Sequence, residues 1–266
     1  FLEPYRLNQK KIKKKIVFDL YENKNIKTSD LLLACSKDES KKLKKMFYDK
    51  TIATIENGID SEFLHAHSLK NKNINKKILL FLSQIIPIKG LDRLIEIINE
   101  LGRDKFKGWE LHIAGDNSGK YGHKLLSKVS ELKLDDIIKF IGPKHGKDKL
   151  KVFDNSSAFI LPTFNENFGI VVAEALSRAK PVITTQGTPW EDLKLFNCGF
   201  WAENNKKGIK TSIMKLLLMT DHELELMGLR GKKMIEKKYM WSIAAKKTIE
   251  LYKWMIKKGQ KPDFII

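Results

Sequence analysis

The stretch that most constrains the fold is residues 157–185, SAFILPTFNENFGIVVAEALSRAKPVITT. Residues 157–161 form an apolar run of strand length, residues 162–167 a polar loop, residues 169–178 a helical segment, and residues 182–185 a β-branched strand. When two such strands lie parallel in one sheet, the chain crosses between them in a right-handed sense. The sequence therefore predicts a strand–loop–helix–strand unit within a parallel sheet.

The same alternation of strands and helices fills the chain from residue 78 onward. The pattern predicts strands at 78–82, 109–114 and 137–141, and helices at 91–101, 122–132 and 147–153. Residues 205–258 are almost wholly helical, in three segments divided near Asp221 and Tyr239. A series of this kind predicts an α/β fold in which helices cover both faces of a parallel sheet. Ligands of such sheets bind at the carboxyl ends of the strands.

The part of the chain before residue 78 has a weaker pattern. It predicts strands at 31–36 and 51–55, a helix at 37–46, and a charged, Asn-rich linker at 67–77. Residues 5–24 place apolar residues on one face of a helix and lysines on the others. Such a helix lies against anionic lipid headgroups, or it docks on a sheet through its apolar face, and the pattern leaves both interpretations open.

The chain is strongly basic, with a formal net charge of +18 and a pI near 9.6. A charge of this size is compatible with binding to nucleic acid. Only five of the 50 basic residues are arginine, however, and arginine supplies most of the forked contacts to bases and phosphates. Scattered lysine is typical of a compositional bias, so we expect no nucleic acid partner.

Cysteine usage and the length of the apolar runs bear on the compartment. Cys35 and Cys198 are far apart and match no disulfide or zinc spacing, which is typical of a reducing, cytoplasmic compartment. No apolar run approaches the roughly 18–20 residues of a membrane-spanning helix. We therefore expect a cytoplasmic protein.

Two carboxylates stand out in the central stretch. Glu174 lies in an otherwise apolar helix, where a buried carboxylate needs a hydrogen-bonding or charged partner, and Glu166 lies eight residues earlier in the preceding loop. The helix between them begins near Gly169 with unpaired N–H groups, which favour anions. The spacing leaves two interpretations open. The acids flank a ligand that carries hydroxyls and phosphate, or Glu166 caps the helix and Glu174 pairs with a lysine.

The residues of this stretch resemble a known family. The segment 162–169, PTFNENFG, followed by Glu174-Ala175 and Lys180-Pro181-Val182-Ile183, resembles the E-x7-E segment of family 4 (group 1) glycosyltransferases. These are retaining enzymes of the GT-B fold. The continuation through Gly187-Thr188-Pro189-Trp190 and Cys198-Gly199-Phe200-Trp201 resembles the branch that builds bacterial lipopolysaccharide, capsule and exopolysaccharide.

The resemblance implies an α/β GT-B architecture with a complete Rossmann-like donor domain, a partial N-terminal Rossmann-like domain and a C-terminal crossover helix. On this basis we expect residues 1–66 to be the C-terminal part of an acceptor-side domain, residues 67–240 to be the donor-binding domain, and residues 241–266 to form a helix that packs back on the first domain. The chain starts at Phe1 in helix-like sequence, so we expect further residues upstream.

The resemblance also assigns roles to individual residues. Glu166 and Lys89 would be catalytic, with Glu166 on the hydroxyls of the donor sugar and Lys89 on the diphosphate. The predicted residues for the sugar and phosphates are Gln84, Lys89, Asn167, Phe168, Gly169 and Ile170. Those predicted for the nucleotide are Gly115, Ile141, Lys144 and Glu174. Gln84 stands where the family usually has arginine, which replaces a charge-assisted hydrogen bond by a weaker neutral one.

The implied activity is transfer of a hexosyl group from a nucleotide sugar, with UDP or GDP, to a bacterial polysaccharide or lipopolysaccharide acceptor. The sequence has no Asp-x-Asp motif, so we expect no metal ion and no cofactor besides the nucleotide sugar. Expected partners are a saccharide or a lipid-linked saccharide, and the inner face of the cytoplasmic membrane as a peripheral contact. The alternative is a catalytically weakened nucleotide-sugar-binding module of the same fold, which Gln84 favours.

Overall fold

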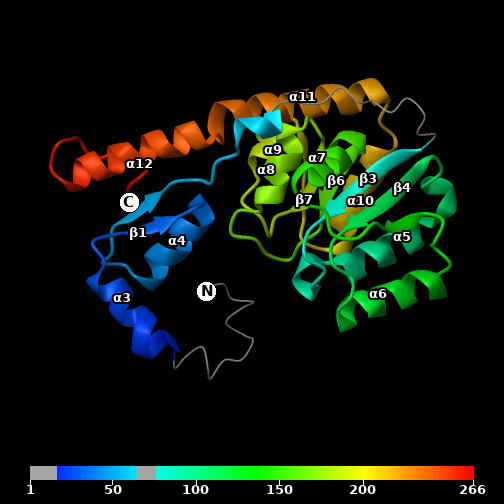
Figure 1. Ribbon diagram of the computed structural model, residues 1–266, viewed down its shortest axis with the longest axis horizontal. Helices are drawn as coiled ribbons and strands as arrows, with labels where there is room; N and C mark the ends of the chain where they lie inside the picture. Colours follow the sequence, from blue (N-terminus) through cyan, green and yellow to red (C-terminus); the bar gives the residue numbers. More distant parts are fainter. Residues whose placement is uncertain (1–16, 65–75) are drawn as a thin grey trace. The chain divides into compact units, whose positions relative to one another are not determined.

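The computed structural model describes residues 17–64 and 76–266 of the chain (Figure 1). Two compact units are present, Phe1–Glu56 together with Ala244–Ile266, and Asn57–Ile243. The second boundary lies inside helix α12 (Trp241–Met255). The predicted linker at 67–77 lies largely outside the described residues, and the first strand of the larger unit begins at its last residue.

The larger unit is built on a six-stranded parallel sheet in the order β5-β4-β3-β6-β7-β8. Its strands are β3 (Lys77–Leu82), β4 (Trp109–Ala114), β5 (Ile138–Phe140), β6 (Ala158–Leu161), β7 (Val182–Thr185) and β8 (Gly199–Ala202). The first five strands confirm the predicted alternation. Strand β8, Gly-Phe-Trp-Ala, is an edge strand that the hydrophobic pattern did not reveal, because three of its four residues are only half-buried.

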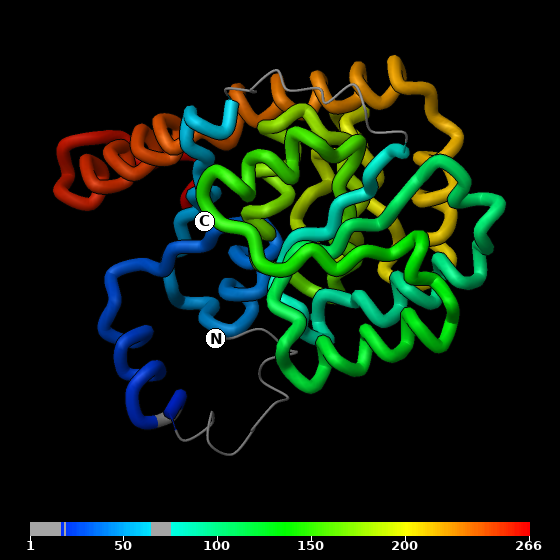
Figure 2. The backbone as a smooth tube through the Cα atoms, turned by 45° about the vertical axis from the view of Figure 1, so that its right-hand side comes forward, coloured from blue at the N-terminus to red at the C-terminus, as the bar shows by residue number. Residues whose placement is uncertain are grey.

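Helices cover both faces of this sheet (Figures 1 and 2). One face carries α5 (Leu91–Lys105), α6 (Lys120–Glu131) and α10 (Lys206–Leu217). The other carries α7 (Gly146–Asn155), α8 (Ile170–Ser177) and α11 (Asp221–Lys238), and the short α9 (Asp192–Leu195) packs beside β8. The α/β prediction is therefore confirmed, including the helical C-terminal region.

The core of the larger unit lies along the central strands. Every residue of β6 and β7 is buried, as expected for strands covered on both faces, where apolar residues run without alternation. The hydroxyls of the two buried threonines of β7 donate to backbone carbonyls of strand β6 and of the loop that follows it. Thr184 Oγ1 donates to Leu161 O at 2.9 Å, and Thr185 Oγ1 donates to Thr163 O at 2.6 Å. The polar end of β7 is thus compatible with full burial.

The smaller unit has a two-stranded parallel sheet of β1 (Leu32–Ala34) and β2 (Ile52–Thr54), with α4 (Lys37–Met46) between them. The end of the chain pairs with β2, because Ile52 N donates to Ile266 O and Thr54 N to Phe264 O, both at 2.9 Å. Ala53, Leu251 and Ile265 form the core of this unit. The chain therefore returns to β2 by backbone hydrogen bonds after α12 ends, which the sequence pattern did not predict.

The predicted basic helix at 5–24 is described only from residue 17. Residues Phe18–Glu22 form a π-helical turn, and α3 (Asn23–Thr28) follows, so the helix extends beyond its predicted end. Val17, Leu20 and Tyr21, three members of the predicted apolar face, are 41%, 63% and 65% exposed. This part of the apolar face is therefore not covered by the described residues. The remaining members, residues 12 and 16, lie outside them.

Candidate functional site

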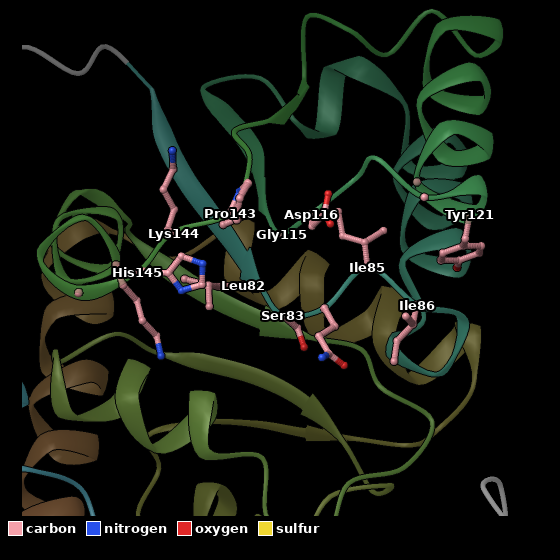
Figure 3. A pocket seen from close by; sticks show the side chains of 16 residues that line it. Leu82, Ser83, Ile85, Ile86, Gly115, Asp116, Tyr121, Pro143, Lys144 and His145 are labelled. Carbon is pink, nitrogen blue, oxygen red and sulfur yellow. The ribbon is translucent and has the colours of Figure 1, made fainter.

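A pocket of about 710 Å³ lies at the carboxyl ends of β3, β4 and β5. Its walls come from residues within 82–86, 114–122 and 143–149, which follow these three strands. Figure 3 shows Ile85 and Tyr121 on one side and Lys144 and His145 on the other. The strand order reverses between β3 and β6, and the pocket borders this topological switch point. Open α/β sheets bind their ligands at such a place.

Lys89 and Glu166 reach each other from the loops that follow β3 and β6. Lys89 ends the short helix η3 (Pro87–Lys89), and its ammonium forms an ion pair with Oε1 of Glu166. The two side chains are 14% and 17% exposed, so the pair is shielded but reachable. The interpretation in which Glu166 caps the following helix is wrong, because α8 has no side-chain cap and Glu166 pairs with Lys89 instead.

Close packing between the same two loops fixes this ion pair. Gly90 has φ +70°, and a Cβ there would lie 2.1 Å from Pro162 O, so no larger residue fits. The backbone of Ile88 accepts two further bonds, one from Thr163 Oγ1 at 3.0 Å and one from Phe164 N at 2.8 Å. The Lys-Gly and Pro-Thr-Phe segments therefore hold one another in place.

Arg93 joins these loops to the end of β8. Its guanidinium donates to Pro162 O at 2.6 and 3.0 Å, to Thr163 O at 3.0 Å and to Asn204 Oδ1 at 2.8 Å. It also lies 3.8 Å from the centre of the Phe164 ring. The side chain is buried, and this burial lowers the pKa of Arg93 to about 10. Arg93 thus holds the loop that carries the Glu166 carboxylate.

The N-terminus of α8 lies beside Glu166. Gly169 is in the left-handed region at φ +76°. A Cβ atom at Gly169 would lie 3.6 Å from Cγ of Glu166. The preceding carbonyl, Phe168 O, accepts a bond from Trp190 Nε1 at 2.6 Å, and both rings pack on Tyr239. The first turn of the helix keeps N–H groups without intrahelical partners, which favour an anion. The aromatic cluster fixes this turn.

Glu174 lies in the second turn of α8 and is only 6% exposed. Its Oε1 forms an ion pair with Lys149 Nζ at 2.6 Å. Its Oε2 is buried, and no hydrogen-bond partner for it is present among the described residues. The interpretation of Glu174 as a helix acid paired with a lysine is therefore confirmed. It leaves half of the carboxylate unsatisfied, which is unusual for a buried polar group.

The residues predicted for the nucleotide lie in or near the pocket. Gln84, Gly115 and Lys144 line it. Gly115 has no room for a side chain, since a Cβ would lie 2.4 Å from Ser83 O. Ile141 is half-buried in the segment that leads into the pocket wall. The prediction that these loops converge at one edge of the sheet is confirmed, whereas their contact with a nucleotide stays a prediction.

The structure arranges the predicted residues in two groups. One group lines the pocket, and the other surrounds the N-terminus of α8 with Lys89, Glu166, Phe168 and Gly169, together with half-buried Asn167 and the 40% exposed Ile170. Lys149 connects the groups, because it lines the pocket and pairs with the buried acid of α8.

Three residues that fix the site were not identified from the sequence, namely Lys149, Arg93 and Trp190. Lys149 is adjacent to buried Leu150 and one helical turn before buried Phe153, so its place beside the apolar stripe of α7 was a readable signal. Arg93 lies among apolar residues of α5, which was a second signal. In the sequence, Trp190 stands out only as part of the family resemblance.

Among residues 17–64 and 76–266, no three His, Cys, Asp or Glu side chains come together as a metal site would require. Within the same residues, no helix has the length and apolar character needed to cross a membrane.

Comparison with solved structures defines the class of fold. Anabaena Alr3699/HepE, in complex with UDP and glucose, matches with a TM-score of 0.76 and 15% sequence identity, over 96% of this chain and 68% of that chain. The parallel sheet, its helical layers and this similarity together define an α/β fold of the GT-B type, as the sequence resemblance implied.

Residues 64–234 match the model of the family described as glycosyl transferases group 1. This match covers well over half of the chain, and the chain belongs to that family. An uncharacterized glycosyltransferase of Methanocaldococcus jannaschii is 26% identical over 216 residues, 80% of this chain and 56% of that protein. The capsular polysaccharide biosynthesis glycosyltransferase CapM of Staphylococcus aureus is 27% identical over 197 residues, 73% of this chain and 50% of that protein. The chain thus spans about half the length of these relatives.

Proposed function

We propose that this chain carries the donor site of a retaining glycosyltransferase that takes a hexosyl group from a nucleotide sugar. The observation that carries the proposal is the arrangement at the carboxyl edge of the larger sheet. A pocket of about 710 Å³, the N-terminus of α8 and two Lys–Glu ion pairs lie along this edge. Family membership supports the proposal, as does the fold shared with HepE, whose structure contains UDP and glucose.

The diphosphate of the donor would bind at Lys89 and at the N–H groups of residues 168–170. A lysine cation and the positive end of a helix both attract phosphate, and α8 supplies the second of these. Gln84, which lines the adjacent pocket, would add a neutral hydrogen bond. Lys89 and Glu166 neutralise each other in their ion pair. Donor binding would therefore give each a new partner, phosphate for Lys89 and a sugar hydroxyl for Glu166.

The rest of the donor would extend from this point into the pocket. Asn167 would assist Glu166 at the sugar, and Glu174 would accept hydrogen bonds from the ribose through its unsatisfied Oε2. The base would lie between Gly115 and the 141–144 segment, where Gly115 allows close approach to the backbone. These contacts fit UDP or GDP equally well.

The transfer step would need no protein nucleophile. The acceptor hydroxyl oxygen bonds to the anomeric carbon on the face that the diphosphate leaves, the bond from that carbon to the phosphate oxygen breaks, and the hydroxyl proton passes to the departing phosphate. The configuration at the anomeric carbon is kept. Lys89 and the N-terminus of α8, rather than a metal ion, would stabilise the charge on the departing phosphate, in line with the lack of an Asp-x-Asp motif.

The acceptor would be a saccharide, free or lipid-linked, of a bacterial surface polysaccharide or lipopolysaccharide. The similarity to CapM, a capsular polysaccharide biosynthesis glycosyltransferase, supports this class. With a lipid-linked acceptor, the protein would be cytoplasmic and would contact the inner face of the cytoplasmic membrane as a peripheral protein. Sedimentation with anionic vesicles checks this contact, and a protein that stays in the supernatant contradicts it.

A second candidate function is nucleotide-sugar binding without transfer. Gln84 favours it, because the residue lines the pocket without bringing a charge to the phosphates. Release of free UDP from UDP-sugars in the presence of saccharide acceptors separates the two functions. Binding without release supports the binding module.

Thermal unfolding with UDP, GDP and ADP tests the donor site itself. At ligand about 100-fold above its Kd, one-site binding adds roughly 2.7 kcal/mol of stability. We expect one of these nucleotides to raise the Tm of the wild type and to lose most of this effect in Glu174→Ala. Glu236→Ala, an exposed acid on α11, is the matched control and should keep the full shift. A folded wild type that no nucleotide stabilises would contradict the proposal.

A further inference from the structure

Lys149 lies beside the proposed donor site, but none of the donor contacts proposed above involves it. Its ammonium lies 2.6 Å from Glu174 Oε1 and 5.8 Å from the centre of the Phe63 ring, and the same side chain lines the pocket. Only 23% of the side chain is exposed. Lys149 is therefore held from two sides at the point where the pocket meets the buried acid of α8.

The ion pair between Lys149 and Glu174 leaves one carboxylate oxygen of Glu174 without a hydrogen-bond partner among the described residues. A buried charged pair is stable when its remaining donors and acceptors are also satisfied. Here Oε2 of the carboxylate is buried without a partner among the described residues. The ammonium has three N–H groups, and one of them is used on Oε1. One acceptor and further donors are thus available at the same edge of the pocket.

The free carboxylate oxygen of Glu174 and the remaining N–H donors of Lys149 together match the hydrogen bonds of a vicinal diol. Each hydroxyl of a diol donates one hydrogen bond and accepts others, so two adjacent hydroxyls fit a carboxylate oxygen and an ammonium placed side by side. A lone carboxylate satisfies only the donor side of the diol. A phosphate is a poorer match, because its oxygens would meet the carboxylate charge of Glu174 at the same point.

We propose that Lys149 is a specificity-determining residue that binds the ribose diol of the donor nucleotide together with Glu174. The ammonium donates to one ribose hydroxyl oxygen, while Glu174 Oε2 accepts from the other hydroxyl. The same ammonium holds Glu174 in its acceptor geometry. This inference rests on the proposed nucleotide-sugar function and adds to it a residue on α7 and a selection for ribonucleotides over deoxyribonucleotides.

Calorimetric titration with UDP, GDP and their 2′-deoxy and 3′-deoxy analogues tests the inference on the whole chain. For the wild type we expect removal of either hydroxyl to weaken binding roughly tenfold to a hundredfold, as for loss of a charge-assisted hydrogen bond. Lys149→Met should weaken binding of the ribonucleotide by a similar factor and reduce its preference over the deoxy analogues to below about threefold. Lys149→Arg keeps a charged donor and should restore much of the preference.

The control is Lys151→Met, on the same helix, where the lysine is 67% exposed and pairs only with its neighbour Asp148 among the described residues. It should bind like the wild type. If Lys149→Met fails to fold because it leaves a buried charge unpaired, Lys149→Met combined with Glu174→Gln removes that charge and is compared with Glu174→Gln alone. The double variant should bind the ribonucleotide more weakly than the single one, and equal binding would overturn the role of Lys149.

The outcomes separate the inference from the function on which it rests. A wild type that binds UDP or GDP and prefers it over the deoxy analogues, beside a Lys149→Met variant with the same preference, would overturn the role of Lys149 and leave the nucleotide site intact. A wild type that binds ribo and deoxy forms equally would overturn the diol contact. A wild type that binds neither nucleotide would overturn both.

Discussion

Replacing Arg93 by methionine tests whether this buried cation holds the loop that carries Glu166. Methionine has a similar length and fits an apolar helix face, so the change removes the charged donors with little change in volume. Arg93 is 5% exposed and donates to two backbone carbonyls and to Asn204. The variant leaves these acceptors behind in the protein interior.

The expected loss of stability follows from those contacts. Pro162 O loses both of its bonds from Arg93, and an unsatisfied buried carbonyl costs about 1–3 kcal/mol. Thr163 O keeps the bond from Thr185 Oγ1, and the lost contact with the Phe164 ring adds about 1–2 kcal/mol. Removal of a buried charge offsets part of this, as the lowered pKa of Arg93 indicates. The net destabilisation is about 2–3 kcal/mol.

Thermal unfolding followed by circular dichroism measures this effect. For a unit of this size, about 2–3 kcal/mol corresponds to a fall in Tm of about 5–10 °C. The control is Arg103→Met on the same helix, an exposed residue whose ion pair with Asp136 contributes at most about 1 kcal/mol. An Arg93→Met variant with the Tm of the Arg103→Met control would refute the conclusion that Arg93 holds the loop.

Three further predictions concern other parts of the chain. Gly90→Ala should lower the free energy of unfolding, measured in urea, by about 2–4 kcal/mol, because the strain of the left-handed backbone adds to a clash with Pro162 O. Gly102→Ala also has a positive φ but meets no neighbouring atom, so it should lose only about 1–2 kcal/mol. Equal losses in the two variants would contradict the clash. Trp190→Phe keeps the ring but removes the bond to Phe168 O, so nucleotide binding in calorimetry should weaken several-fold, and unchanged binding argues against this role. Burial raises the pKa of the Cys198 thiol to about 12, so the folded chain keeps a proton that the unfolded chain loses, and stability from this group falls as pH rises from about 9 to 12. Iodoacetamide at pH 8.5 should therefore modify the other cysteine first, and fast modification of Cys198 contradicts its burial.

Much of the larger unit was predictable because its strands are covered on both faces. Continuous apolar runs such as 158–161 and β-branched runs such as 182–185 leave few alternatives, and the structure forms strands at both places. Where an element is half-exposed, the pattern fails. Strand β8 at 199–202 is half-buried, and the pairing of residues 264–266 with β2 depends on backbone hydrogen bonds that carry no side-chain signal.

The site was predictable where it depends on chain order and not where it depends on side-chain direction. The loops carrying Lys89 and Glu166 follow strands that are neighbours in the sheet, so their approach follows from topology. The partner of Glu174 was a matter of which lysine on α7 points inward. Only the packing of α7 selects Lys149 over its exposed neighbours. The sequence alone therefore allows both interpretations of the two carboxylates.

The most direct test of the central claim is a crystal structure of the chain with UDP or GDP bound. The account predicts the diphosphate at Lys89 and the N-terminus of α8, the ribose at Glu174 and Lys149, and the base between Gly115 and the 141–144 segment. In that complex the ion pair between Lys89 and Glu166 should be open, with each residue on the ligand. A nucleotide bound elsewhere, or an unchanged ion pair beside an empty pocket at saturating nucleotide, would contradict the account.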